Sequence, residues 1–167
     1  AVVGSTGAST ITFSNIPQNY AHLHFRIVAR SARNYSGNVV DGLNFYVNGS
    51  TYLARLFALQ GNGSAASATY NTDPMIWIMD DGQGAGSNFG AGIIDLLDYT
   101  SSTKNKVARG FGGFDNNSAS YNGIIGVSNS LFMTQTPITS VSFYSAYGAG
   151  VNFDQYTQIA MYGIKGA

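Results

Sequence analysis

The chain has 167 residues, and 44% of them are hydrophobic while only 10% are charged, far below the roughly 25% that is typical of soluble domains. Eight basic and eight acidic residues leave no net charge, so no overall field draws the protein to nucleic acid or to an anionic membrane. Cysteine is absent, which excludes disulfides, thiolate nucleophiles and sulfur-ligated metals.

Short runs of alternating apolar and polar residues, separated by turns rich in Gly, Asn and Ser, follow one another along the chain. Residues 1–9 are small and polar and are expected to form an N-terminal arm, ahead of a single domain at residues 10–167. The clearest run places Leu23, Phe25 and Ile27 on one face, as in a half-buried strand. The runs predicted as strands are Thr10–Ile16, Tyr20–Arg30, Leu43–Val47, Met75–Met79, Phe89–Tyr99, Lys104–Phe111, Tyr121–Val127, Leu131–Met133, Thr139–Ser145 and Tyr156–Ile164.

One segment, Thr51–Gln60, fits two kinds of structure. Its apolar residues also match one face of a short helix. The preceding dipeptide Asn48-Gly49 favours a tight hairpin turn, and such a turn needs a returning partner strand. We therefore predict a strand here, followed by a loop through Gly61–Ser64 and the small residues after it.

The pattern as a whole predicts an all-β fold. Met75–Met79 is apolar on both faces and carries the only Trp, as expected of a strand buried in the middle of a sandwich. About nine or ten strands with turns at short intervals predict an antiparallel β-sandwich, of jelly-roll type.

The polar residues do not assemble into a recognisable reaction centre. His22 and His24 share one face of a strand, but no third metal ligand stands near them in the sequence. Asp95 and Asp98 are three residues apart in a predicted strand, so they are expected to point to opposite faces and not to act as a catalytic pair. The chain contains no Glu at all. We predict no catalytic residue, no metal site and no cofactor, and therefore no enzyme.

Tyrosines in or beside predicted loops are the candidates for surface contact. Tyrosine offers a large contact area at a low entropic cost, both to proteins and to sugars. The four candidates are Tyr35, Tyr70, Tyr121 and Tyr147.

Three stretches together resemble a group of small bacteriophage virion proteins of the tail-fibre-like or capsid-decoration-like kind. They are Ile11–Tyr20 leading into the Leu23–Arg30 strand, Phe89–Tyr99, and the ending Met161–Gly166. The resemblance implies a β-sandwich located on the virion, at the particle surface. It transfers no functional residue to this chain.

The sequence therefore predicts a non-enzymatic virion structural protein that reinforces or decorates the capsid or an appendage. An uncharged surface has little charge repulsion to keep copies apart, so we expect a homo-oligomer, for which a trimer is a fitting symmetry. Other virion proteins of the capsid or tail are further expected partners, whereas nucleic acid and membrane are not. The alternative function is a host-receptor module of the tail-fibre type that binds surface polysaccharide.

Overall fold

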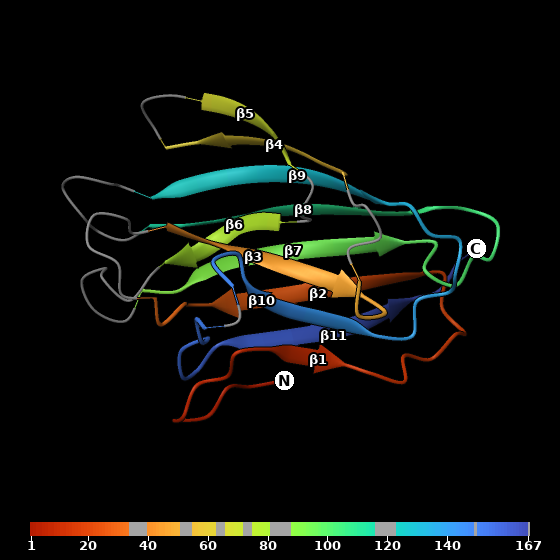
Figure 1. The fold of residues 1–167 in the computed structure, drawn as a ribbon, viewed down its shortest axis with the longest axis horizontal. Coiled ribbons are helices and arrows are strands. Elements are labelled where there is room, and N and C mark those ends of the chain that lie inside the picture. Colours follow the sequence, from red (N-terminus) through yellow and green to blue (C-terminus); the bar gives the residue numbers. More distant parts are fainter. Residues whose placement is uncertain are drawn as a thin grey trace.

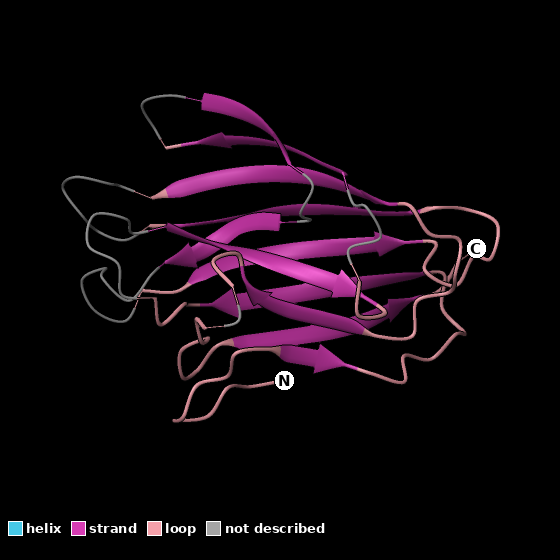
Figure 2. Ribbon diagram, viewed as in Figure 1, coloured by secondary structure: helices cyan, strands magenta, loops and turns pink. Residues whose placement is uncertain are grey.

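The computed structural model describes residues 1–33, 40–50, 55–62, 66–71, 75–80, 88–115, 123–148 and 150–166. Within these residues it contains eleven strands and no helix (Figure 2). The strands form two antiparallel sheets, of four and seven strands, which pack face to face as a β-sandwich (Figure 1). The predicted all-β antiparallel sandwich is confirmed.

The two sheets differ in width. The four-stranded sheet has the order β1 (Ile11–Phe13), β10 (Val141–Ser145), β3 (Val40–Val47) and β6 (Met75–Asp80). The seven-stranded sheet has the order β11 (Gln158–Ile164), β2 (His22–Ala29), β7 (Gly90–Leu97), β8 (Lys106–Phe114), β9 (Ile124–Phe132), β4 (Arg55–Gly61) and β5 (Ala66–Asn71). In Figure 1 the hairpin of β4 and β5 extends beyond the strands of the smaller sheet.

The core lies between the sheets and is rich in phenylalanine. Phe25 on β2 meets Phe143 on β10 with ring centroids 5.2 Å apart, and Phe45 on β3 meets Phe132 on β9 at 5.3 Å. All four rings are almost completely buried. The alternation read from the sequence explains this arrangement, because every second side chain of a strand points to the same face.

The hairpin turn at Asn48-Gly49 is confirmed, but its expected partner strand is not. Both residues have positive φ angles, and backbone hydrogen bonds join Val47 and Ser50 in both directions. The next described segment, β4, is a strand as predicted. It pairs with β5 and β9 in the other sheet, whereas β3 pairs with β10 and β6.

Three further expectations need correction. The small residues after Gly61–Ser64 do not remain a loop: Ala66–Asn71 forms the edge strand β5. The two predicted strands Tyr121–Val127 and Leu131–Met133 are one continuous strand, β9. The strand that contains Trp77 is an edge strand of the smaller sheet and not a central one; the side chain of Trp77 lies outside the described part.

The segment predicted as an N-terminal arm lies against the chain that leads into β11. Val2 forms a bridge with Gln158, and Ala8 forms one with Phe153. Val3 is buried in the core cluster.

Candidate functional site

The most distinctive surface is the face of the seven-stranded sheet that points away from the smaller sheet, here called the outer face. Large apolar side chains stand on it between 39% and 65% exposed, although such side chains are usually found inside a protein. They come from five adjacent strands and are Val28, Phe57, Leu59, Ile93, Phe111, Ile125 and Val127. We call this set the apolar area.

The apolar area follows from strands that are apolar on both faces. On β4, Leu56 and Ala58 are buried while Phe57 and Leu59, which alternate with them, are exposed. A strand with this composition is normally covered on both sides. In this sandwich the smaller sheet covers only the inner side.

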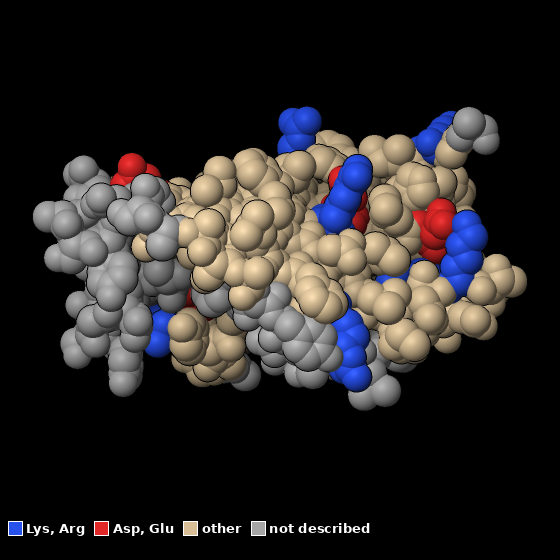
Figure 3. Space-filling model, turned by 90° about the horizontal axis from the view of Figure 1, so that it is seen from above, with Lys and Arg blue, Asp and Glu red and all other residues tan. Residues whose placement is uncertain are grey.

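Charged residues make up only 10% of the chain. Figure 3 looks on the molecule from the edge formed by β4 and β5, and there the described surface is broadly uncharged, with scattered basic and acidic groups. Side chains of the size found in the apolar area, exposed to this degree, present roughly 600 Å², the upper end of the range for the largest patch on a monomer. A patch of this size marks an interaction surface.

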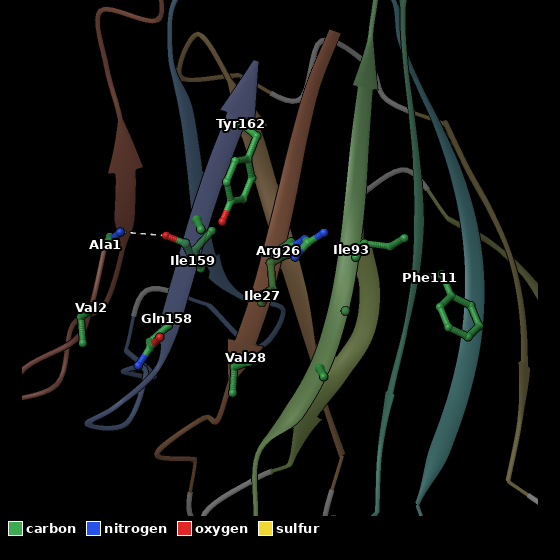
Figure 4. A pocket seen from close by; sticks show the side chains of 13 residues that line it. Ala1, Val2, Arg26, Ile27, Val28, Ile93, Phe111, Gln158, Ile159 and Tyr162 are labelled. Carbon is green, nitrogen blue, oxygen red and sulfur yellow. Dashed lines mark hydrogen bonds between the residues drawn. The ribbon is translucent and has the colours of Figure 1, made fainter. Parts of the chain in front are cut away.

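The outer face is hollowed over β11, β2 and β7. A trough of about 630 Å³ lies there, and its lining includes the small residues Ala91, Gly92 and Ala160. Larger side chains, among them Tyr162 and Phe111, also line it (Figure 4). The trough is large enough for a side chain of another protein or for a small ligand.

A polar row crosses the outer face next to the apolar area. His24 Nδ1 donates to Asp95 Oδ1 at 2.7 Å, and Arg109 Nε donates to Asp95 Oδ2 at 3.0 Å. Burial, the largest single influence, raises the pKa of Asp95, but the hydrogen bonds and charges of His24 and Arg109 outweigh it and lower that pKa overall. Asp95 is therefore a carboxylate held by partners on both neighbouring strands.

His22 has its own partner at the end of the face. Its Nδ1 accepts a hydrogen bond of 3.0 Å from the backbone N–H of Asp98, whose carboxylate accepts from Lys104 Nζ at 2.8 Å. The Lys104 hydrogen bond is the main reason why the pKa of Asp98 is lowered. His22 and His24 thus share a face as predicted, and the described residues contain no cluster of three or more groups that could hold a metal ion.

The expectation that Asp95 and Asp98 point to opposite faces is wrong. β7 ends at Leu97, and Asp98 has a φ angle of 50°, so the alternation of the strand does not reach it. Both carboxylates lie beside histidines of the same face, but each is bonded to separate partners.

Of the four predicted tyrosines, Tyr147 alone has its side chain in the described part of the structure. Tyr147 is 51% exposed and follows β10, where the Arg33 guanidinium carbon lies 3.3 Å from its ring centroid, a cation–π contact. Tyr70 belongs to β5, opposite Phe57, and not to a loop; its side chain lies outside the described part. Tyr35 and Tyr121 lie outside the described residues altogether.

The exposure of the residues that make the apolar area was not predicted from the sequence. A continuous apolar run on β4 or β7 was the available signal, but such a run predicts that both faces of the strand are buried and does not reveal an exposed one.

None of the described residues lies in a helix that could cross a membrane.

Comparison with known proteins identifies no relative. The chain matches no protein-family model, no curated protein and no solved structure.

Proposed function

We propose that this chain is a non-enzymatic structural protein of a bacteriophage particle surface, where copies of it pack together to reinforce the capsid or an appendage. The observation that carries the packing role is the apolar area on the outer face, which spans five strands and is left uncovered by the smaller sheet. The location on a phage particle is supported by the three resembling sequence stretches alone.

A second copy of the chain is the partner that this surface fits best. The chain has no net charge and few charged residues, so copies approach one another without appreciable repulsion. A standard interface buries about 800 Å² of surface on each partner, and somewhat more than half of that surface is apolar. The apolar area, roughly 600 Å² on each copy, is therefore large enough to supply the apolar part of such an interface.

The strand order supports the predicted jelly-roll type of sandwich. The chain crosses between the two sheets at most of its connections, as from β1 to β2, from β2 to β3 and from β5 to β6. A jelly roll winds between its sheets in this manner. The hairpin formed by β8 and β9 would then be an addition in the middle of the larger sheet.

Sedimentation of the purified chain tests the packing role. We expect an oligomer at micromolar concentration, and we expect Leu59→Asp to shift it to monomer because a carboxylate would be buried in the contact. The matched control is Thr12→Asp, which adds the same charge to an exposed position on the smaller sheet.

A wild-type chain that sediments only as monomer would count against the proposal, and so would an oligomer that Thr12→Asp disrupts as strongly as Leu59→Asp. Binding of the labelled chain to intact and empty phage particles then tests the particle-surface location.

The second candidate function is binding of host-surface polysaccharide, which the trough favours. Tyr162 is 48% exposed at its edge, with the Arg26 guanidinium 5.8 Å from its ring centroid, and Gln158 also lines the trough. An aromatic ring beside polar groups is a stacking platform for a sugar. A glycan array compares the wild type with Tyr162→Ala: loss of signal in the variant supports this function, and no signal from the wild type rejects it.

A further inference from the structure

The hydrogen-bond register of the larger sheet defines two rows of neighbouring side chains on the outer face. The first row, from β11 to β4, is Ala160, Arg26, Ile93, Phe111, Val127 and Leu59. The second row, beside it, is Tyr162, His24, Asp95, Arg109, Asn129 and Phe57. The boundary between β7 and β8 divides each row into two halves of three residues.

The two halves of the outer face differ in their side chains and in the size of their hollows. The β11, β2 and β7 half contains the trough, lined in part by Ala91 and Ala160. The β8, β9 and β4 half carries large exposed apolar side chains: Phe57 at 65%, Ile125 at 55% and Leu59 at 53%. The first half therefore has the larger hollow, while smaller hollows of about 290 to 350 Å³ lie between the side chains of the second half.

We propose that two copies of the chain pack outer face against outer face, about a two-fold axis that runs parallel to the strands between β7 and β8. This proposal rests on the proposed packing function and specifies its interface. A half-turn about such an axis lays β7 over β8 of the second copy, β2 over β9, and β11 over β4. The same patch is then used by both copies, as a closed two-fold interface requires.

The axis brings matching side chains together in both rows. In the first row, Ile93 faces Phe111 of the second copy, and the small Ala160 faces the protruding Leu59. In the second row, Tyr162 faces Phe57, and both are exposed aromatic side chains. These three pairs join apolar or aromatic side chains, and in one of them a small residue, Ala160, meets a protruding one, Leu59.

Charge is also complementary across this axis. Asp95 faces Arg109 of the second copy, and by symmetry Arg109 faces Asp95, so the opposite charges meet twice near the centre of the contact. Within one copy these residues already form a hydrogen bond of 3.0 Å, so the interface would hold a cluster of four alternating charges. Such placement fixes the register of an interface more than it adds affinity.

Arg26 also lies in the contact and faces Val127 of the second copy. Its guanidinium already lies over the Tyr162 ring, 5.8 Å from the centroid. That cation–π contact compensates in part for the water that the guanidinium would lose.

A charge-swap mixture tests the arrangement. In Asp95→Arg the introduced arginine faces Arg109 of the other copy, and in Arg109→Asp the introduced aspartate faces Asp95. We expect each variant alone to weaken self-association by at least about tenfold, since like charges then meet across the interface. When the two variants are mixed, opposite charges meet again, and we expect a heterodimer with an affinity within about tenfold of the wild type.

Lys104→Asp is the matched control, because it reverses an exposed charge outside the apolar area and should leave association unchanged. Thermal unfolding of each variant at a concentration below association shows whether it is folded. A second measurement does not depend on the charged pair: the chain has no cysteine, so an oxidised mixture of Ile93→Cys and Phe111→Cys should form a disulfide-linked pair far more than either variant alone.

The outcomes separate this interface from the function on which it rests. If the wild type associates but the mixtures give neither rescue nor the mixed disulfide, or if the oligomer is a trimer, the two-fold interface is wrong and the packing function stands. If the wild type is monomeric, or binds polysaccharide as a monomer through Tyr162, both are wrong.

Discussion

His24 on β2 and Asp95 on β7 are joined by a hydrogen bond of 2.7 Å across neighbouring strands, next to the apolar area of the outer face. Because the pKa of Asp95 is lowered in the folded chain, its ionised form stabilises the fold at any pH above the ordinary value of 3.8. Asp95→Asn should lower the free energy of unfolding by about 1–2 kcal/mol at neutral pH. The difference from the wild type should shrink as the pH falls below 3.8, measured by denaturant unfolding of dilute protein.

Asp41 should show the opposite dependence on pH. It is fully buried, and burial is the main reason why its pKa is raised, although Ser145 Oγ donates to its Oδ2 at 2.7 Å. The folded state therefore binds this proton more tightly than the unfolded state, and stability falls as the pH rises from 3.8 through the raised pKa. Asp41→Asn should remove this loss, so that the variant becomes more stable relative to the wild type as the pH rises from acidic to neutral. A pH-independent difference between the two proteins would contradict the prediction.

Lys106 is a fully buried lysine that is satisfied by backbone carbonyls. Its Nζ donates to the carbonyl oxygens of Ser101 at 2.6 Å, Lys104 at 2.8 Å and Thr134 at 3.4 Å, and burial lowers its pKa. Lys106→Met should cost about 2–3 kcal/mol of stability, because these carbonyl groups lose a shared donor. Lys104→Met is the control: it breaks only the exposed pair with Asp98 and should cost less than about 1 kcal/mol. Chemical denaturation of both variants gives the comparison, and equal losses would show that the buried ammonium has no special role.

Asn48 joins the β3 turn to the segment before β10. Its φ angle is 49°, its Oδ1 accepts from the backbone N–H groups of Thr139 at 2.8 Å and Ser140 at 3.2 Å, and its Nδ2 donates to the carbonyl of Pro137 at 3.0 Å. Asn48→Gly keeps the backbone conformation and loses only these bonds and the one from Thr139 Oγ1 to Asn48 Oδ1 at 3.3 Å, at a cost of about 1–2 kcal/mol.

Asn48→Ala should cost about 1 kcal/mol more than Asn48→Gly, because alanine also disfavours a positive φ angle. Thermal melting of the two variants side by side measures the difference. Equal melting temperatures would mean that the turn relaxes to another conformation.

The strands themselves were largely predictable from the sequence. Alternation in Tyr20–Arg30 and Phe89–Tyr99 correctly placed β2 and β7, and in β2 it also placed Leu23 and Phe25 in the core, because the direction of a side chain depends only on local strand geometry. The edge strand β5 was missed, since its run of Ala, Ser and Thr has no apolar face to reveal it.

Strand partners were not predictable in the same way. The turn at Asn48-Gly49 was correct, yet the strand after it joins the other sheet. A turn determines only the residues that it connects, whereas the choice of partner depends on all the strands that compete for the same edge.

Sequence alone determined the class of this protein. Its short segments alternate between apolar and polar residues, as strands do, and it has few charges and no cysteine, so the sequence predicts an all-β fold held by packing. Tertiary structure alone decided which of two apolar strand faces becomes core and which is left on the surface. Phe57 and Leu56 are adjacent and similarly apolar, but the smaller sheet covers only the side to which Leu56 points, so Leu56 is buried while Phe57 is 65% exposed. Burial is a property of what lies opposite a side chain, and that depends on strands far away along the chain.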